Sequence, residues 1–326
     1  MPPPTDRQTV LVTGANGFVG RAVVARLATD SRFVVRVTTR RRTSDLPQGV
    51  FQVHGMDLEE RADFREALQG AACVVHAAAR VHVNSDSAQS DIAQFRRTNV
   101  EGTQRLAEQA ANMGVRRVVF VSSVKVNGEW THPGMPFRPF DTPAPEDAYA
   151  VSKAEAEERL FALGREMAMQ IVVVRPPLVY GPGVRGNFAR MLHWAAQGVP
   201  LPLGAVHNRR SLVGLDNLVD LLVSCVDHPA AANQVFLAGD GEDLSTAELL
   251  RRVAVAMGKP PRLLPVSPGL LRAAARAIGR DEMARRLLDS LQVDISHTRE
   301  TLGWEPPLSV DEGLRRAVAP LLEQGR

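Results

Sequence analysis

Short apolar runs alternate with amphipathic segments along the first half of the chain. The runs QTVLVTG, RFVVRVTT, VFQVHGMD, AACVVHAA, VRRVVFVSS and MQIVVVRP are rich in β-branched residues, which is typical of buried strands. Amphipathic segments at about residues 18–28, 59–70, 91–113 and 147–166 predict helices between them. Apolar strands separated by helices indicate a parallel sheet covered on both faces. We therefore expect an α/β protein with a Rossmann-type doubly wound parallel sheet.

A change in composition after Arg175 divides the chain. The segment PPLVYGPG interrupts the alternation, and prolines recur beyond it. Residues 1–175 are predicted to form a dinucleotide-binding domain, to which a helix–strand segment at about 212–240 returns. Residues 176–211 and 241–326 are predicted to form a smaller, mostly helical C-terminal substrate lobe.

Composition and charge exclude several classes of protein. The formal charge of +3 is small, and without a basic helix or an aromatic-studded basic stripe no nucleic-acid partner is expected. No apolar run approaches the roughly 20 residues that span a bilayer, and the first residues lack the apolar core of a signal peptide. The two cysteines, Cys73 and Cys225, lie in apolar stretches typical of buried thiols. We expect a cytoplasmic protein with no membrane partner and no metal site.

A glycine-rich turn follows the first predicted strand and opens the first helix. It reads Gly14-Ala15-Asn16-Gly17-Phe18-Val19-Gly20. Glycines at these positions allow a tight turn and a close approach of pyrophosphate, and the helix N-terminus offers free N–H groups and a positive dipole to the phosphates. The turn predicts a dinucleotide site that includes Gly14, Asn16, Gly17, Phe18, Val19 and Gly20.

The end of the second predicted strand bears on the choice of cofactor. It reads Thr38-Thr39-Arg40-Arg41 and lacks the acidic residue that takes the ribose 2′-hydroxyl of NAD. Thr39, Arg40 and Arg41 are instead suited to a 2′-phosphate, so NADP(H) is favoured and NAD(H) is possible; a solvated basic loop is the alternative. Asp57, after the third strand, is a candidate for the adenine amino group or for a helix cap.

Three residues form the candidate catalytic group. Ser123 ends the run VVFVSS, and Tyr149 and Lys153 lie one turn apart on a predicted helix, so the phenol and the ammonium share a face. The pKa of a tyrosine is ordinarily near 10. A neighbouring ammonium and a nicotinamide cation favour the phenolate and bring that pKa toward the working range of a base.

The chain resembles the extended short-chain dehydrogenase/reductase family, in particular its nucleotide-sugar epimerase/dehydratase group. The matching pieces are TGANGFVG, GMDLEE, VVHAAA, TNVEGT, FVSSVKVNG, YAVSK, RPPLVYGPG, RRSLVGLDNLVD and LGWEPP, and they cover nearly the whole chain in order. The resemblance implies a hydroxyl role for Ser123, an acid/base role for Tyr149 and a ribose-holding, pKa-lowering role for Lys153. It also implies cofactor contacts by Leu58, Ala77, Ala78, Asn99 and Pro176, with Asn99 supporting the lysine environment.

The resemblance also suggests where a substrate binds. Arg210 falls where the family contacts the nucleotide diphosphate, and Asn187 is expected near the substrate. Lys125 follows Ser123 at a position where the family carries other residues; it is a candidate to touch substrate or to donate a second proton, with a solvated loop lysine as the alternative. Leu178 replaces an asparagine that often contacts the nucleotide, and no acid lies beside Ser123, which argues against a 4,6-dehydratase.

These features predict an NAD(P)-dependent enzyme acting at C4 of a UDP-sugar. The likeness to O-antigen-locus proteins and the acid-free Thr39-Arg40-Arg41 edge favour reduction of a UDP-4-keto-6-deoxy-N-acetylhexosamine in surface polysaccharide biosynthesis. A UDP-glucose or UDP-N-acetylglucosamine 4-epimerase is the first alternative, and a non-catalytic NADP sensor the second. By resemblance, a homodimer through the helices near residues 91–113 and 147–166 is expected.

Overall fold

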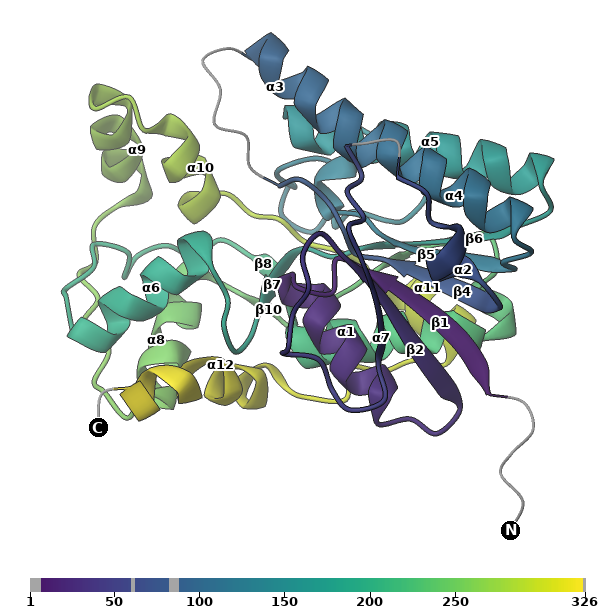
Figure 1. Cartoon of the computed structure of the whole chain (residues 1–326). Coiled ribbons are helices and arrows are strands. Elements are labelled where there is room, and N and C mark those ends of the chain that lie inside the picture. Colours follow the sequence, from purple (N-terminus) through teal and green to yellow (C-terminus); the bar gives the residue numbers. More distant parts are fainter. Residues whose placement is uncertain (1–6, 60–61, 82–87, 325–326) are drawn as a thin grey trace.

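A seven-stranded sheet with the order β3-β2-β1-β4-β5-β6-β9 forms the centre of the large domain (Figure 1). This computed structural model describes residues 7–59, 62–81 and 88–324. All neighbouring strands in the sheet are parallel, which confirms the predicted Rossmann-type doubly wound fold. Its strands are β1 Gln8–Thr13, β2 Phe33–Thr39, β3 Phe51–His54, β4 Ala71–His76, β5 Arg117–Val121, β6 Gln170–Arg175 and β9 Gln234–Leu237. The strand order reverses between β1 and β4, the place where such sheets bind ligands.

Alternate residues of the strands supply two separate cores. In β1, Val10 and Val12 pack with helices α1 (Phe18–Ala28) and α7 (Leu215–Asp227). Leu11 points the other way, toward α2 (Arg65–Leu68), α4 (Thr103–Asn112) and α5 (Ala148–Glu166). Both faces are therefore buried at the inner strands, which explains why these strands are largely apolar; the edge strand β3 is partly exposed.

The segment predicted as one helix at about residues 91–113 has three parts. Helix α3 (Ala88–Phe95) leads into a π-helical stretch, Arg96–Gly102, and then into α4. The wider turn brings Thr98 within 3.0 Å of the Glu59 carboxylate. The helix predicted at about 59–70 is reduced, in the described residues, to the single turn α2.

The second lobe is built on a small three-stranded sheet, β10-β8-β7. Its strands are β7 Leu178–Tyr180, β8 Arg210–Gly214 and β10 Asp243–Leu244, and its helices are α6 Gly186–Gln197, α8 Thr246–Ala256, α9 Pro268–Ala277, α10 Asp281–Leu288 and α12 Val310–Gln324. No helix in the described ranges has the length and apolar character needed to cross a membrane.

Helix α11 (Ser296–Leu302) lies with the large sheet, although the sequence division places it in the second lobe. The Thr298 hydroxyl donates to the Leu237 carbonyl at the end of β9, 2.8 Å away. Leu302 and Trp304 join the core formed with α7. These apolar contacts draw the segment out of the lobe that its position in the chain suggests.

A buried ion pair joins the end of β6 to α5. Arg175 and Glu157 are 5% and 6% exposed, and their closest nitrogen–oxygen distance is 2.5 Å. The Ser122 hydroxyl donates to the same carboxylate, and Arg175 also donates to the Asn127 side-chain oxygen at 3.0 Å. The pair thus ties β6 and α5 to the segment that follows β5.

Replacing Arg175 with Met leaves the Glu157 carboxylate buried without its cation. We expect the free energy of unfolding, measured by chemical denaturation, to fall by roughly 3–5 kcal/mol. The double variant Arg175→Met/Glu157→Met removes both charges and is expected to lose much less. An equal loss in the single and double variants would show that packing, rather than the unpaired charge, sets the cost.

Candidate active site

A cavity of about 940 Å³ opens at the carboxyl ends of β1, β2 and β4. Ten of the predicted cofactor residues line it, namely Gly14, Asn16, Gly17, Thr39, Arg40, Arg41, Asp57, Leu58, Ala77 and Ala78. Residues far apart in the sequence therefore meet at one edge of the sheet. The volume suits an extended ligand of the size of a dinucleotide.

The glycines of the turn are required by close backbone contacts. Gly14 has a φ of +74°, and a Cβ atom there would lie 2.6 Å from the Ala78 nitrogen. A Cβ on Gly20 would lie 2.2 Å from the Gly14 oxygen. Gly17 caps α1, whose first residues, Phe18 and Val19, pack against the core. This narrow cradle at a helix N-terminus fits a pyrophosphate.

The end of the cavity beside β2 carries positive charge. Arg40 and Arg41 are exposed and line the cavity just beyond β2. Thr39 is buried beside them, its hydroxyl oxygen 2.7 Å from the Gln52 amide. Asp57 accepts the Glu59 backbone N–H at 3.0 Å and also lines the cavity. This bond closes a turn rather than capping a described helix, and the adenine contact of Asp57 stays a prediction.

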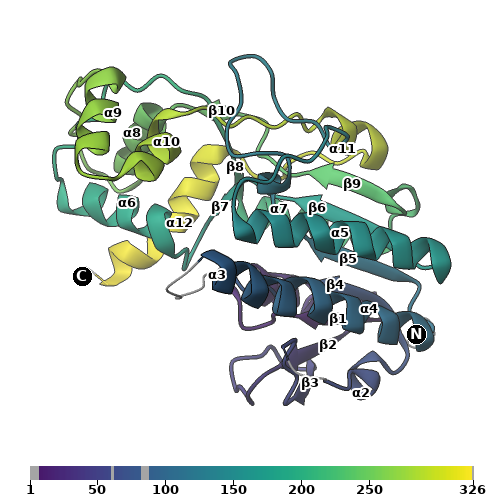
Figure 2. The ribbon, with the colours of Figure 1, turned by 90° about the horizontal axis from the view of Figure 1, so that it is seen from above.

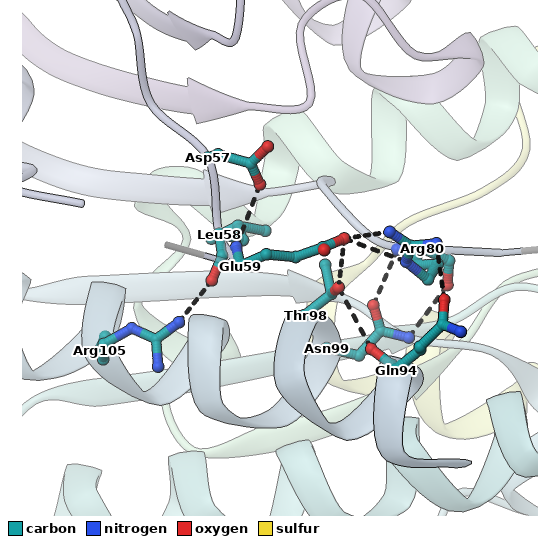
Figure 3. Close-up of polar contacts among 8 residues, drawn as sticks. All are labelled: Asp57, Leu58, Glu59, Arg80, Gln94, Thr98, Asn99 and Arg105. Atoms are coloured by element: carbon teal, nitrogen blue, oxygen red, sulfur yellow. Dashed lines mark hydrogen bonds and ion pairs between the residues drawn. The ribbon is translucent and has the colours of Figure 1, made fainter. Parts of the chain in front are cut away.

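An ion pair that the sequence does not indicate lies across the cavity wall (Figure 3). Arg80 donates to the Glu59 carboxylate, which also accepts the Thr98 hydroxyl at 3.0 Å. The Arg80 guanidinium, more than any other group, holds the pKa of Glu59 below its usual range. Glu59 is adjacent to the predicted Asp57-Leu58 pair, but no sequence spacing connects it with Arg80 or Thr98.

Asn99 links this wall to the catalytic helix. The Asn99 side-chain oxygen accepts the backbone N–H of Arg80 at 2.8 Å, and the side-chain nitrogen donates to the backbone carbonyl of Arg80 at 3.0 Å. It also donates to the Ser152 hydroxyl oxygen at 3.0 Å, and Ser152 donates to the Tyr149 carbonyl at 2.7 Å. Asn99 thereby fixes the first turn of α5; its support of the lysine environment and its cofactor contact stay predictions.

Lys153 lies on α5 and is 1% exposed. Its ammonium donates to the Val121 carbonyl at 2.8 Å and lies 4.2 Å from the centroid of the Phe120 ring. Burial lowers the pKa of Lys153 to about 7, although the charge of Glu157, one turn further on, acts in the opposite direction. Lys153 is therefore able to lose a proton near neutral pH.

Tyr149 is half-buried, with its ring edge-to-face against Phe95 at 6.0 Å between centroids. Burial, followed by the charge of Asp147, raises the pKa of Tyr149 above its ordinary value. The lowering of this pKa by Lys153 together with a nicotinamide cation stays a prediction. Burial disfavours the phenolate, and the Asp147 carboxylate at the start of the same helix opposes it further.

Ser123 lies beside this helix at the end of β5. Its hydroxyl oxygen accepts the Lys125 backbone N–H at 3.2 Å and caps the short turn Val124–Val126. The hydroxyl hydrogen remains available to donate to a ligand. Pro176 supports the same turn, because its carbonyl accepts the Val124 N–H at 2.9 Å.

Lys125 is held by two carboxylates. Its ammonium donates to Glu129 at 2.6 Å and to Asp147, and Asp147 caps α5 by accepting the Ala150 N–H at 2.7 Å. The lysine is therefore not a solvated loop residue, because it steadies the start of the helix that carries Tyr149. Contact of Lys125 with a substrate stays a prediction.

The remaining predicted substrate residues belong to the second lobe. Arg210 begins β8 and donates to the Asp289 carbonyl at 3.0 Å; burial lowers the pKa of Arg210. The side chain of Asn187 lies outside the described part of the chain. Leu178, at the start of β7, is exposed.

Comparison with known proteins gives a consistent picture. Residues 10–239 match the model of the NAD dependent epimerase/dehydratase family. A Vibrio cholerae protein named UDP-glucose 4-epimerase is 44% identical, over 97% of this chain and 96% of its own length. An Escherichia coli O157:H7 protein named N-acetyl-alpha-D-glucosaminyl-diphospho-ditrans,octacis-undecaprenol 4-epimerase is 28% identical, over 80% of this chain and 77% of its own. The structure of MoeE5 with UDP-glucose and NAD has a TM-score of 0.77 and 25% identity, and covers 98% of this chain and 100% of its own.

Substituting Gly14 tests whether the cradle holds a dinucleotide. Gly14→Ala forces a Cβ against the Ala78 nitrogen, and strain of roughly 1–3 kcal/mol is expected at this position. We expect NAD and NADP binding, measured by calorimetry, to weaken by about 10- to 100-fold. Gly49→Ala is the matched control, because Gly49 has a φ of +82° but nothing within 4 Å of its would-be Cβ. Equal losses in both variants would attribute the effect to backbone strain alone.

Proposed function

The chain belongs to the NAD dependent epimerase/dehydratase family and is an NAD(P)-dependent enzyme, and on that basis we propose that it interconverts the C4 epimers of a UDP-linked hexose. The observation that carries the proposal is the grouping of Tyr149 and Lys153, one turn apart on α5, with Ser123 at the end of β5. Asn99 connects the first turn of α5 to Arg80, which lines the cavity whose glycine cradle fits a dinucleotide.

The proposed chemistry follows from the side chains of the chain itself. When bound, an oxidised nicotinamide supplies a hydride acceptor and a positive charge that favours the Tyr149 phenolate. Tyr149 takes the proton of the sugar C4 hydroxyl and later returns it. Ser123 donates its free hydroxyl hydrogen to the same oxygen, and Lys153 orients the ribose. Asn99, acting through Ser152, keeps the first turn of α5 in place for this proton transfer.

We propose epimerisation as the first candidate activity, in place of the reduction predicted from the sequence. The relative named UDP-glucose 4-epimerase supports this order, because its 44% identity extends over almost the whole of both chains. The structure of MoeE5, at 25% identity, contains UDP-glucose and NAD, which supports a UDP-sugar as the substrate class.

Reduction of a UDP-4-keto-6-deoxy-N-acetylhexosamine by NADPH is the second candidate. It is supported by Arg40 and Arg41, which line the cavity, and by the lack of an acidic residue at the end of β2. A reductase consumes one reduced cofactor per turnover and so gains from NADPH, whereas an epimerase regenerates its cofactor within each cycle.

Two assays separate the candidates. UDP-glucose and UDP-N-acetylglucosamine are incubated with the enzyme and a catalytic amount of NAD, and the C4 epimers are followed by NMR. Separately, the 4-keto sugar nucleotide is supplied with NADPH and the loss of absorbance is recorded. Catalytic interconversion without net cofactor turnover supports the epimerase. Stoichiometric NADPH oxidation with no epimer formation would replace it with the reductase.

Tyr149→Phe removes the group that moves the C4 proton. We expect kcat to fall by about 100- to 10,000-fold, as for loss of a general acid/base, with dinucleotide binding retained. Tyr180→Phe is a matched control, because Tyr180 is the only other tyrosine and its hydroxyl bonds Asp240 at 2.8 Å within the core. Its variant is expected to keep kcat within about threefold, a difference of less than 1 kcal/mol in activation free energy. Activity of Tyr149→Phe close to that of the parent would remove Tyr149 from the mechanism.

The double variant Arg40→Ala/Arg41→Ala tests cofactor choice. If these guanidiniums hold a 2′-phosphate, their removal weakens NADP binding by about 10-fold or more, since charge-assisted hydrogen bonds are lost. NAD binding, which lacks that phosphate, serves as the internal control and is expected to change little. Equal losses for the two cofactors would identify the arginines as a solvated loop.

A further inference from the structure

Helices α9 and α10 form a hairpin at the outer end of the second lobe, away from the large sheet in both views (Figures 1 and 2). The inner side of the hairpin is packed. Ala275, Ala284 and Leu288 are buried in a small core with Leu203, Val206 and Leu250, and Leu271 and Leu287 pack against it. The hairpin is therefore a fixed part of the lobe.

The outer side of α9 is apolar and uncovered. Leu270, Ala273, Ala274, Ala277 and Ile278 fall on one side of the helix at its 3.6-residue period, and all five are exposed. Leu270 is 62% exposed and Ile278 67%. We call these five residues the α9 face. The adjoining segments add two more exposed apolar side chains, Leu264 and Met283.

The basic surplus of the chain is concentrated in the same region. Residues 262–289 contain six arginines and three acidic residues, so their excess of three positive charges equals the +3 of the whole chain. Arg272, Arg276 and Arg286 pair with Asp289, Asp281 and Glu282. Arg280 and Arg285 are exposed as well. At the 3.6-residue period, Arg272 and Arg276 lie on the side of α9 away from the α9 face. Arg280 and Arg285 follow this face in the chain, in the turn and on α10.

We propose that the α9–α10 hairpin docks this enzyme on the surface of an anionic lipid bilayer. The α9 face enters the boundary between headgroups and acyl chains, and Arg280 and Arg285 meet the lipid phosphates. Helices of 10 and 8 residues are too short to span the membrane, so the attachment is peripheral. It revises the expectation that the protein has no membrane partner.

Charge and polarity select this occupant over others. A second copy docking by the same face would bring two arginine-rich hairpins together, and their like charges would repel. A nucleic acid would satisfy the arginines but would offer nothing to Leu270 and Ile278. An anionic bilayer matches both features, because its surface is negative and its interior is apolar.

The test uses the full chain and vesicles in a sedimentation assay. One set is phosphatidylcholine alone, and the other contains about one third phosphatidylglycerol to give a negative surface. We expect binding to the anionic vesicles, at least tenfold weaker binding to the neutral ones, and weakening by added salt. This experiment does not depend on the proposed catalytic activity.

Variants locate the binding surface. Leu270→Asp/Ile278→Asp and Arg280→Glu/Arg285→Glu are each expected to weaken anionic vesicle binding at least tenfold. Val255→Asp is the matched control, because Val255 is 69% exposed on α8, outside the hairpin, and its binding should equal that of the parent. Circular dichroism checks that every variant is folded.

Three outcomes would overturn the proposal. The first is that the parent binds no vesicles, and the second is that the hairpin variants bind as well as Val255→Asp. The third is self-association of the parent, seen by light scattering and abolished by Leu270→Asp/Ile278→Asp, with no vesicle binding. That last result would assign the α9 face to a second copy of the chain.

Discussion

The arrangement of the candidate site depends on the buried contact between Arg175 and Glu157. Taking both charges out of water is costly, and a pair of this kind contributes little net stability compared with apolar side chains. Its consequence is geometric. Glu157 lies one turn after Lys153 on α5, and its carboxylate also accepts the hydroxyl of Ser122, the neighbour of Ser123. One ion pair therefore fixes the catalytic helix against the strand end that carries the third catalytic candidate.

Burial shifts the two central titratable groups toward their uncharged forms. The pKa of Lys153 is lowered to about 7 by burial, and the pKa of Tyr149 is raised by burial and by Asp147. Lys125 offsets part of the second effect, because it pairs with Asp147 at the start of α5. Burial also strengthens electrostatic interactions. A positive charge that enters the cavity therefore lowers the pKa of the Tyr149 phenol more than it would lower the pKa of a phenol in water.

Local features could be predicted from the sequence, and long-range features could not. The glycine cradle and the Tyr149–Lys153 spacing depend on neighbours within a turn or two, so their patterns indicate both structure and role. The contacts of Glu59 with Arg80 and Thr98 join residues far apart in the chain and depend on a π-helical turn that periodicity does not show. The upward shift in the pKa of Tyr149 likewise required knowledge of its burial.

The α9 face illustrates the same limit on the surface of the molecule. Around α9 the apolar positions extend over more than one side, with Leu271 and Ala275 next to the exposed stripe of Leu270 and Ile278. Sequence periodicity shows how broad the apolar surface is, but not which part the lobe covers. Only the folded lobe reveals that one side is packed and the other is left to solvent. The uncovered stripe and the exposed Arg280 and Arg285 that follow it support the proposed docking surface, since a core helix would have its apolar side covered.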